Sequence, residues 1–232
     1  MGQGPGSQLM RLDALMAEYC SPEWQELLKE RNTLLTFKRG EHIFTDGQVA
    51  THMFMIHRGR VKVVVRQAGG RERIIRIAGD GEVLGHRAIG DQPTYTATVT
   101  ALSETRVNTI PMPLFLSTLR ANNLFCYHFL LYFAEEMRQL DQGMRDLMEL
   151  DVPQRVAKTL LMNKDIFGFD EKDKRKFAFT LSRKDIASMA GTTYESVIRT
   201  LADFQDKGII KLVGKEIRLL KKRELERILS YS

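Results

Sequence analysis

The sequence has few cysteines and no long apolar run, and these two absences narrow the class of protein. Its 232 residues include 2 cysteines, Cys20 and Cys126, which cannot form a disulfide framework or supply the four thiolates of an iron–sulfur cluster. No apolar run approaches the ~20 residues that span a membrane. The first residues, MGQGPGSQ, do not resemble a secretory signal. We therefore expect a protein of the reducing cytoplasm without a membrane partner.

Patterns that carry catalysis are also missing. A cupin-type enzyme needs a His-x-His pair among its metal ligands, and the sequence contains no such pair. It has no phosphate-binding glycine loop and no pairing of a nucleophile with a base. We expect no enzymatic activity, no metal and no cofactor, with a cupin-type enzyme as the minor alternative. His86 or Cys126 as a haem ligand, and Cys126 as a redox-sensing thiol, stay open beside a structural role.

The chain has a net charge of +6, and the whole positive excess lies in its C-terminal part. Residues 1–150 contain 17 Lys and Arg against 17 Asp and Glu, whereas residues 151–232 contain 18 against 12. Neutralisation of phosphates by Lys and Arg dominates affinity for DNA, so this asymmetry favours a DNA-binding C-terminal domain. A merely soluble basic surface is the alternative, and it explains the asymmetry less well.

Residues 181–210 have the pattern of two short amphipathic helices joined by a glycine turn, which is typical of a helix-turn-helix. Ser182 is placed as an N-cap, with Asp185 three residues later, and Gly191 ends the first helix. Thr193 caps the second helix. The apolar residues of that helix share one face: Val197, Leu201 and Phe204. An ordinary helical hairpin with a solvated polar face is the alternative.

The other face of the second helix carries side chains that suit base recognition. Arg199 can donate to guanine O6 and N7, and Glu195 can accept from a cytosine amino group. A hairpin at 209–220, with Gly214 in its turn, predicts the wing of a winged helix. Lys211, Lys215 and Arg218 would meet phosphates there. The expected DNA-contacting residues are Ser182, Arg183, Thr193, Tyr194, Glu195, Ser196, Arg199 and Lys215.

Residues 34–85 are rich in short alternating segments separated by glycine-containing turns, and further strands are expected at 97–100 and 106–110. Turns at roughly 8–12-residue spacing favour an antiparallel sandwich or barrel over alternating strands and helices. After the break at Pro111 and Pro113, a short helix at 114–120 precedes a long one at 124–150.

The long helix carries apolar residues in steps of three and four, which is a heptad pattern. The seam that would join two copies in a parallel dimer consists of Leu130, Phe133, Met137, Leu140, Met144 and Leu147, with Cys126 before them. A helix packed on its own domain is the alternative. Asp151 and Gln154 form a capping box that starts the next helix, so a domain boundary near 150 has a local cause.

The predicted fold is therefore α+β: an N-terminal antiparallel β-barrel or jelly roll, a long dimerisation helix, and a C-terminal winged helix-turn-helix. We expect a flexible N-terminus at 1–19, a sensor barrel at 20–122, the dimerisation helix at 123–150 and the DNA-binding domain at 151–232.

This arrangement resembles the CRP/FNR superfamily of bacterial transcription regulators over about residues 20–222. The most specific segments are FKRGEHIFTDGQVATHMFMIHRGRVKVV and LSRKDIASMAGTTYESVIRTL. The family's reading pattern falls on Glu195 and Arg199, while Tyr194 replaces an arginine of the cyclic-AMP receptor branch. The resemblance implies a barrel of the cyclic-nucleotide-binding type. It implies double-stranded DNA with a palindromic operator, a second copy of the chain and RNA polymerase as partners.

The segment that binds the effector in such proteins departs from the cyclic-nucleotide pattern. It matches GEVLGHRAIGDQPTYTATVTA at 81–101, where Gly85 is retained. His86 replaces the glutamate expected for the ribose, and Tyr95, before Thr96, replaces the arginine expected for the cyclic phosphate. The effector-pocket residues by this resemblance are Gly85, His86, Arg87, Ala88, Tyr95 and Thr96. GHRAIG is closer to the FNR-type subgroup, whose cysteine cluster is absent here.

These observations predict a homodimeric, sequence-specific DNA-binding regulator whose small-molecule effector is unknown and is not cyclic AMP. Three possibilities stay open: a small molecule other than cyclic AMP, a haem, or no effector at all. Two alternatives remain: a signalling protein whose helix-turn-helix contacts protein rather than DNA, and a regulator gated by a cyclic nucleotide.

Overall fold

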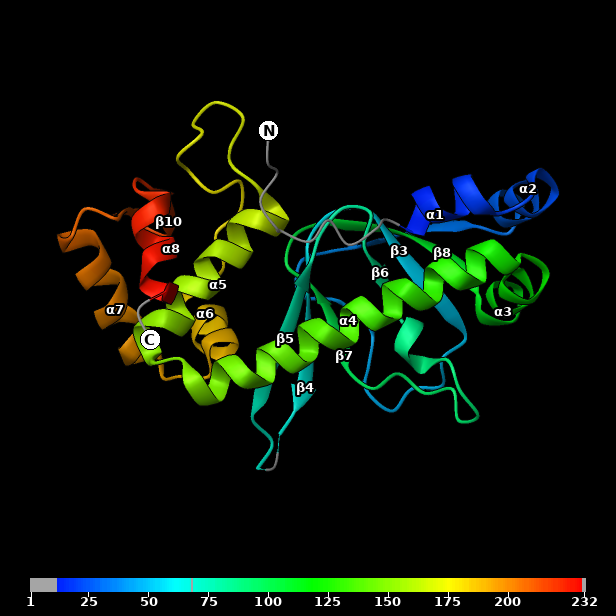
Figure 1. The fold of residues 1–232 in the computed structure, drawn as a ribbon, viewed down its shortest axis with the longest axis horizontal. Helices are drawn as coiled ribbons and strands as arrows, with labels where there is room; N and C mark the ends of the chain where they lie inside the picture. The colour runs from blue at the N-terminus through cyan, green and yellow to red at the C-terminus, as the bar shows by residue number, and fades with distance from the viewer. Residues whose placement is uncertain (1–11, 68, 231–232) are drawn as a thin grey trace. The chain divides into compact units, whose positions relative to one another are not determined.

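The computed structural model describes residues 12–67 and 69–230, and the chain divides into two compact units. The first unit contains the chain up to Val65 together with Ala78–Gln139, and the second contains Arg66–Ile77 together with Leu140–Ser232. The long helix α4 (Asn123–Glu149) begins in the first unit and ends in the second (Figure 1). The combination of a β-sheet domain, a long helix and a helical C-terminal domain confirms the predicted α+β class.

From Leu12 onward, two helices precede the strand β1. They are α1 (Leu12–Tyr19) and α2 (Pro22–Glu30). The expectation of a flexible segment at 1–19 is wrong for residues 12–19, because α1 buries Leu12 and Leu15 in the first unit. Residues 1–11 lie outside the described part of the chain. The backbone N–H of Ser21, at the start of α2, donates to Asn122 Oδ1 at 2.9 Å, which ties this segment to the residue before α4.

The barrel consists of two four-stranded sheets, in the orders β1-β8-β3-β6 and β2-β7-β4-β5. The strands of the first sheet are β1 (Thr33–Phe37), β8 (Thr105–Pro111), β3 (His52–Arg58) and β6 (Val83–Leu84). Those of the second are β2 (His42–Phe44), β7 (Thr98–Ala101), β4 (Val61–Arg66) and β5 (Glu72–Ala78). The pairings β1–β8, β3–β8, β2–β7 and β4–β7 are all antiparallel, which confirms the predicted sandwich.

The turn between β3 and β4 requires glycine. Gly59 has φ 139°, and a Cβ at this position would lie 2.5 Å from Thr105 Oγ1. The backbone N–H of Gly59 donates to Asp80 Oδ1 at 2.7 Å. Only a residue without a side chain combines this conformation with such close packing.

The short 3-10 helix η1 (His86–Ala88) follows Gly85, and α3 (Met112–Ala121) follows the last barrel strand. Helix α4 packs on the first unit through an aromatic cluster, in which Phe125 and Phe129 lie edge-on to Phe115 with ring centroids 6.0 and 5.1 Å away. This packing explains why residues 123–139 belong to the same compact unit as the barrel, whereas we expected a separate dimerisation helix.

Besides the end of α4 and most of β5, the described residues of the second unit form four helices and a hairpin. They are α5 (Val152–Phe167), α6 (Arg183–Ala190), α7 (Tyr194–Asp206), the hairpin β9 (Ile210–Val213) and β10 (Glu216–Leu219), and α8 (Lys222–Ser230). The capping box predicted at Asp151 and Gln154 is confirmed, with the Gln154 N–H donating to Asp151 Oδ1 at 2.8 Å.

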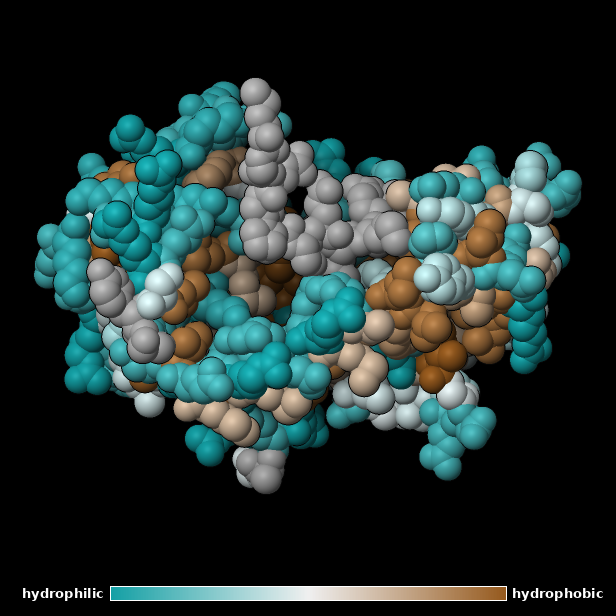
Figure 2. Space-filling model, viewed as in Figure 1, coloured by the Kyte–Doolittle hydropathy of each residue, from teal (hydrophilic) through white to brown (hydrophobic). Residues whose placement is uncertain are grey.

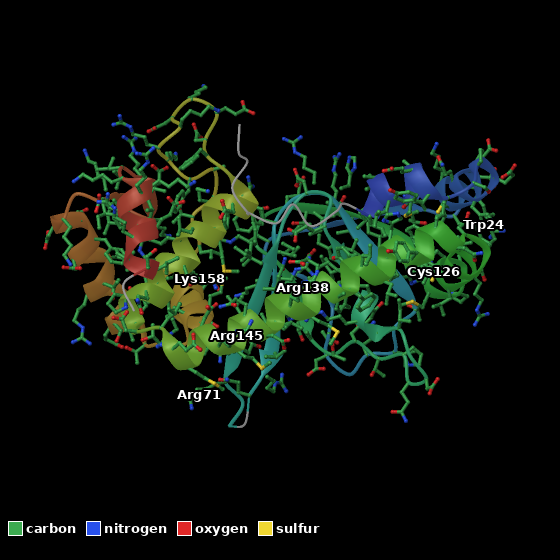
Figure 3. All side chains as sticks on the ribbon, in the orientation of Figure 1. Trp24, Arg71, Cys126, Arg138, Arg145 and Lys158 are labelled. Atoms are coloured by element: carbon green, nitrogen blue, oxygen red, sulfur yellow. The ribbon has the colours of Figure 1, made fainter. Side chains whose placement is uncertain are left out.

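The predicted seam on α4 is exposed at four of its six positions. Leu130, Met137, Leu140 and Met144 are exposed, and the first, second and last of these are spaced by seven residues. Figure 2 shows apolar residues gathered over the part of α4 that lies near α3 in Figure 1, where Leu124, Tyr127 and Leu131 extend the exposed apolar surface. Cys126, Arg138 and Arg145 mark the course of the helix in Figure 3.

The other two seam positions, Phe133 and Leu147, are half-buried and also contact residues of their own chain, so their place in a dimer seam stays a prediction. The Phe133 ring packs edge-on to His86, with centroids 5.3 Å apart. Leu147 packs in the second unit, where its Cδ2 would lie 3.2 Å from a Cβ at Gly191. No described helix has the length and apolar character needed to cross a membrane.

Candidate nucleic-acid interface and effector segment

Arg155 of α5 binds the end of α6. Arg155 donates from Nε to the carbonyl of Ala190 at 2.7 Å and from Nη1 to the carbonyl of Leu150. Gly191 then adopts the left-handed conformation, with φ 59° and ψ 46°, and ends α6 as predicted. A glycine turn and an arginine bound to the last carbonyl of α6 thus lie at the junction between α6 and α7.

Helix α7 separates a buried face from an exposed face. Its core-facing residues are buried: Val197, Thr200, Leu201 and Phe204. With about 100° between successive residues, Glu195, Ile198 and Arg199 lie on the opposite side, and all three are exposed. Tyr194 in the first turn is 46% exposed and Ile198 is 41% exposed. The side chains predicted to read bases thus share one solvent-facing surface, which we call the reading face.

Two of the polar residues predicted to contact DNA, Ser182 and Thr193, serve as helix caps. Ser182 Oγ accepts the Asp185 N–H at 3.1 Å and donates to Asp185 Oδ2 at 2.6 Å. Thr193 Oγ1 accepts the Ser196 N–H at 3.2 Å and donates to Ser196 Oγ at 3.1 Å. These bonds confirm the predicted caps and fix the N-termini of α6 and α7. Contact of the same hydroxyls with DNA stays a prediction.

Arg183 is bound within the protein. Its Nη1 donates to the carbonyl of Lys215 at 3.0 Å, and its Nη2 lies 3.5 Å from the carbonyl of Gly214. Burial lowers the pKa of the Arg183 guanidinium from its ordinary value, and the charge of Tyr194 acts in the opposite direction. The side chain therefore joins the first turn of α6 to the turn of the wing.

The cations of the wing are not equivalent. Lys211 and Lys215 are exposed, as a phosphate contact requires. Arg218 instead lies with Nη2 3.4 Å from Asp173 Oδ2, in the loop before α6. Lys176, in the same loop, pairs with Glu216, and that hydrogen bond raises the pKa of the lysine. Arg218 thus holds β10 to this loop, which differs from the phosphate contact that the sequence suggested.

Sequence reasoning missed Ile198 as part of the reading face. An exposed isoleucine between Glu195 and Arg199 places an aliphatic side chain among groups that suit base edges. The signal was present, because Ile198 lies outside the 197, 201 and 204 stripe that fills the core. Apolar side chains in the major groove contact the methyl group of thymine.

In the effector segment, Tyr95 is part of the barrel core. It is buried, and its hydroxyl donates to the carbonyl of His52 at 2.8 Å. Its ring stacks on Phe44 with centroids 3.9 Å apart. Gly85 has φ 84°, and a Cβ there would lie 3.2 Å from Tyr95 Cε1, so Gly85 and Tyr95 pack together. Burial raises the pKa of the Tyr95 hydroxyl. A neutral buried tyrosine offers no cation for a cyclic phosphate.

His86 and Arg87 converge on one carboxylate of α4, that of Glu136. His86 Nε2 contacts Glu136 Oε2, and Arg87 Nε lies 3.3 Å from the same oxygen. The Tyr132 hydroxyl donates to Glu136 Oε1 at 3.2 Å. Both His86 and Glu136 are buried, with 2% and 3% of their surface exposed. We call these four residues the carboxylate cluster.

The other two predicted pocket residues make no contact with the Glu136 carboxylate that the structure shows. Ala88 is buried at the end of η1, and Thr96 is exposed. Glu136 was missed by sequence reasoning, although a signal existed. Phe125, Phe129 and Tyr132 form the buried stripe of α4, and the next position of that stripe is the acidic Glu136. A charged residue that continues an apolar stripe predicts a buried partner of opposite charge.

Within residues 12–67 and 69–230, no group of three or more His, Cys, Asp or Glu is arranged to hold a metal ion. The two cysteines differ in environment, since Cys20 is buried and Cys126 is exposed. Burial raises the pKa of the Cys20 thiol to about 11.

Comparison with known proteins agrees with both units. The family described as cyclic nucleotide-binding domain matches residues 34–122, and the family described as Crp-like helix-turn-helix domain matches residues 154–228. The chain is 30% identical over 191 residues to the CRP-like cAMP-activated global transcriptional regulator of Mycobacterium tuberculosis, covering 82% of this chain and 85% of that protein. The chain belongs to the CRP/FNR superfamily of transcription regulators.

Other CRP/FNR relatives support the same fold. The anaerobic regulatory protein of Bacillus subtilis is 22% identical over 209 residues, covering 90% of this chain and 88% of that protein. The structure of FixK2 from Bradyrhizobium japonicum superposes with a TM-score of 0.76 at 22% identity, covering 85% of this chain and 96% of that one. The protein is therefore a CRP/FNR-type transcription regulator with a helix-turn-helix DNA-binding domain.

Proposed function

We propose that this CRP/FNR regulator acts as a homodimer that reads an inverted-repeat operator by placing α7 of each copy in the major groove. The observation that carries the proposal is the reading face, on which Glu195, Ile198 and Arg199 are exposed opposite the buried residues of the same helix. The N-terminal part of such a helix contacts base edges, and two-fold symmetry of a dimer is mirrored in the operator.

The apolar stripe of α4 supports the dimer. Leu130, Met137 and Met144 are each more than half exposed and follow one another at heptad spacing, so burial against a second copy would remove them from water. We propose that the partners are double-stranded DNA, a second copy of the chain and RNA polymerase, that the protein acts in the cytoplasm, and that it has no enzymatic activity.

For the effector, we propose that it is not a cyclic nucleotide. The M. tuberculosis relative is named for activation by cyclic AMP, but the positions of the two expected anchors here hold His86, which contacts Glu136, and Tyr95, which is bound to the β3 backbone. An anion bound without a charged partner loses a charge-assisted hydrogen bond, which is roughly twice as strong as a neutral one.

The proposal is tested by selecting bound sequences from a random pool of double-stranded DNA with purified protein, with and without cyclic AMP. We expect one inverted repeat to be enriched to the same degree in both pools. Enrichment only with the nucleotide would establish the cyclic-nucleotide-gated alternative. If neither pool yields a motif and binding does not weaken with salt, the alternative of a helix-turn-helix that contacts protein is favoured.

A further inference from the structure

The carboxylate cluster joins the effector segment to α4 inside the first unit. Two basic residues come from η1, and the carboxylate comes from the helix. Glu136 Oε2 contacts His86 Nε2 and accepts a hydrogen bond from Arg87 Nε at 3.3 Å. Glu136 Oε1 accepts a hydrogen bond from the Tyr132 hydroxyl at 3.2 Å. Both oxygens of the carboxylate are therefore bound.

The surroundings of the cluster hold the imidazole in place. The His86 ring makes edge contacts with two aromatic rings of α4, with centroids 5.6 Å from Tyr132 and 5.3 Å from Phe133. His86 and Glu136 are almost fully buried, whereas the Arg87 side chain is 30% exposed. The site is thus closed on the imidazole side and open to solvent at the guanidinium.

A carboxylate surrounded by imidazole, guanidinium and phenol groups has the environment of a bound anionic ligand. An isolated buried carboxylate would be strongly destabilised, and only partners of this kind offset the loss of water. The groups that bind it belong to the segment that the fold uses for effectors, where the anchors expected for a cyclic nucleotide are replaced. The chain supplies the anion itself.

We propose that Glu136 is a resident anionic ligand of the effector segment. Its carboxylate occupies an anion site formed by His86, Arg87 and Tyr132, and it fixes η1 against α4 without any small molecule. This goes beyond the proposed function, because it assigns the site a ligand class, a carboxylate, and identifies the residue that provides it. It does not depend on DNA binding, and its test reads the fold of the full-length protein.

The test removes the resident carboxylate and offers a free one. Thermal melting of the full chain is measured for the wild type and for Glu136→Ala in sodium acetate and in sodium chloride at matched ionic strength. We expect Glu136→Ala to melt about 10 °C lower in chloride, because removal of one partner of a buried ion pair is strongly destabilising. Acetate should raise its Tm with half-saturation in the millimolar range, and the wild type should not respond.

Glu135→Ala is the matched control. Glu135 precedes Glu136 on the same helix, its side chain is 38% exposed, and it pairs with Arg138 on the surface. This variant should melt near the wild type and show no specific response to acetate. The proposal is overturned if Glu136→Ala melts as the wild type does, or if acetate raises the Tm of wild type, Glu136→Ala and Glu135→Ala equally.

A second variant covers the case in which Glu136→Ala does not fold. Glu136→Gln keeps the length of the side chain and removes its charge. We expect its Tm to fall below that of the wild type in chloride, and we expect Glu136→Ala to recover folded protein when refolded in acetate. A Glu136→Gln protein that melts with the wild type would show that no anion is needed at this position, and the proposal would be wrong.

Discussion

The guanidinium of Arg183 donates to the carbonyl of Lys215 at 3.0 Å, so the first residue of α6 is bound to the turn of the wing. Sequence reasoning had placed this arginine on DNA. Its geometry instead suits a structural role, because a planar guanidinium can approach the two adjacent carbonyls of Gly214 and Lys215 together.

Replacement of Arg183 separates the two roles. We expect Arg183→Ala to lower the free energy of unfolding by about 1 kcal/mol and to leave the salt dependence of DNA binding unchanged. Lys215→Ala, by contrast, should reduce the slope of log K against log salt by about 1.8 for the homodimer, since one phosphate contact is lost in each copy. Urea titration and DNA binding at several salt concentrations measure both effects. A reduced salt slope for Arg183→Ala would show that Arg183 contacts a DNA phosphate after all.

Arg199 should recognise one base in each half-site of the operator. We expect Arg199→Ala to weaken binding of the selected operator by about 1–3 kcal/mol and to relax the preference at one position of each half-site. Competition with operators that carry single base substitutions measures the preference. If Arg199→Ala keeps the preference of the wild type at every position, the reading face is assigned to the wrong residues.

Ile198 should read a thymine methyl group. Replacing thymine by deoxyuridine at one operator position removes that methyl and should weaken wild-type binding by about 0.8 kcal/mol, roughly fourfold. In Ile198→Ala the same replacement should have little effect, because the aliphatic contact is already lost. Binding of both proteins to both operators forms a double-mutant cycle. Equal losses in the two proteins would show that Ile198 does not touch the methyl.

The exposed stripe of α4 should control dimerisation. We expect Met137→Asp to raise the dissociation constant of the dimer more than tenfold, since it would place a carboxylate in an apolar seam. Arg138→Ala, which changes the neighbouring residue outside the stripe, serves as the control. Sedimentation equilibrium measures both. A Met137→Asp protein that remains as dimeric as the control would place the interface elsewhere.

Cys20 should react slowly in the folded protein. Its pKa is raised to about 11 by burial, so almost no thiolate is present at pH 8. In Cys126→Ser, where Cys20 is the single thiol, we expect labelling at pH 8 to be slow and to accelerate as the pH approaches 11. Labelling in urea should be fast, because the unfolded thiol recovers its ordinary pKa. Rapid labelling of the folded variant would contradict the burial of Cys20.

Features that depend on neighbours along the chain could be predicted from the amino-acid sequence. The caps at Ser182, Thr193 and Asp151 and the glycine turn at Gly191 were predicted because a cap and a left-handed turn are decided by a few adjacent residues. The barrel strands followed from alternation and turn spacing, and the charge asymmetry needed only composition.

The tertiary structure alone decided which groups meet across the chain. Glu136 lies 50 residues from His86 along the chain, and no local pattern reveals their contact. In the same way, Arg183 reaches the wing because β9 and β10 fold back toward α6, and Phe133 of the expected seam packs against His86. Periodicity assigns a residue to a face of its helix, but the partner that covers that face is set by three-dimensional packing.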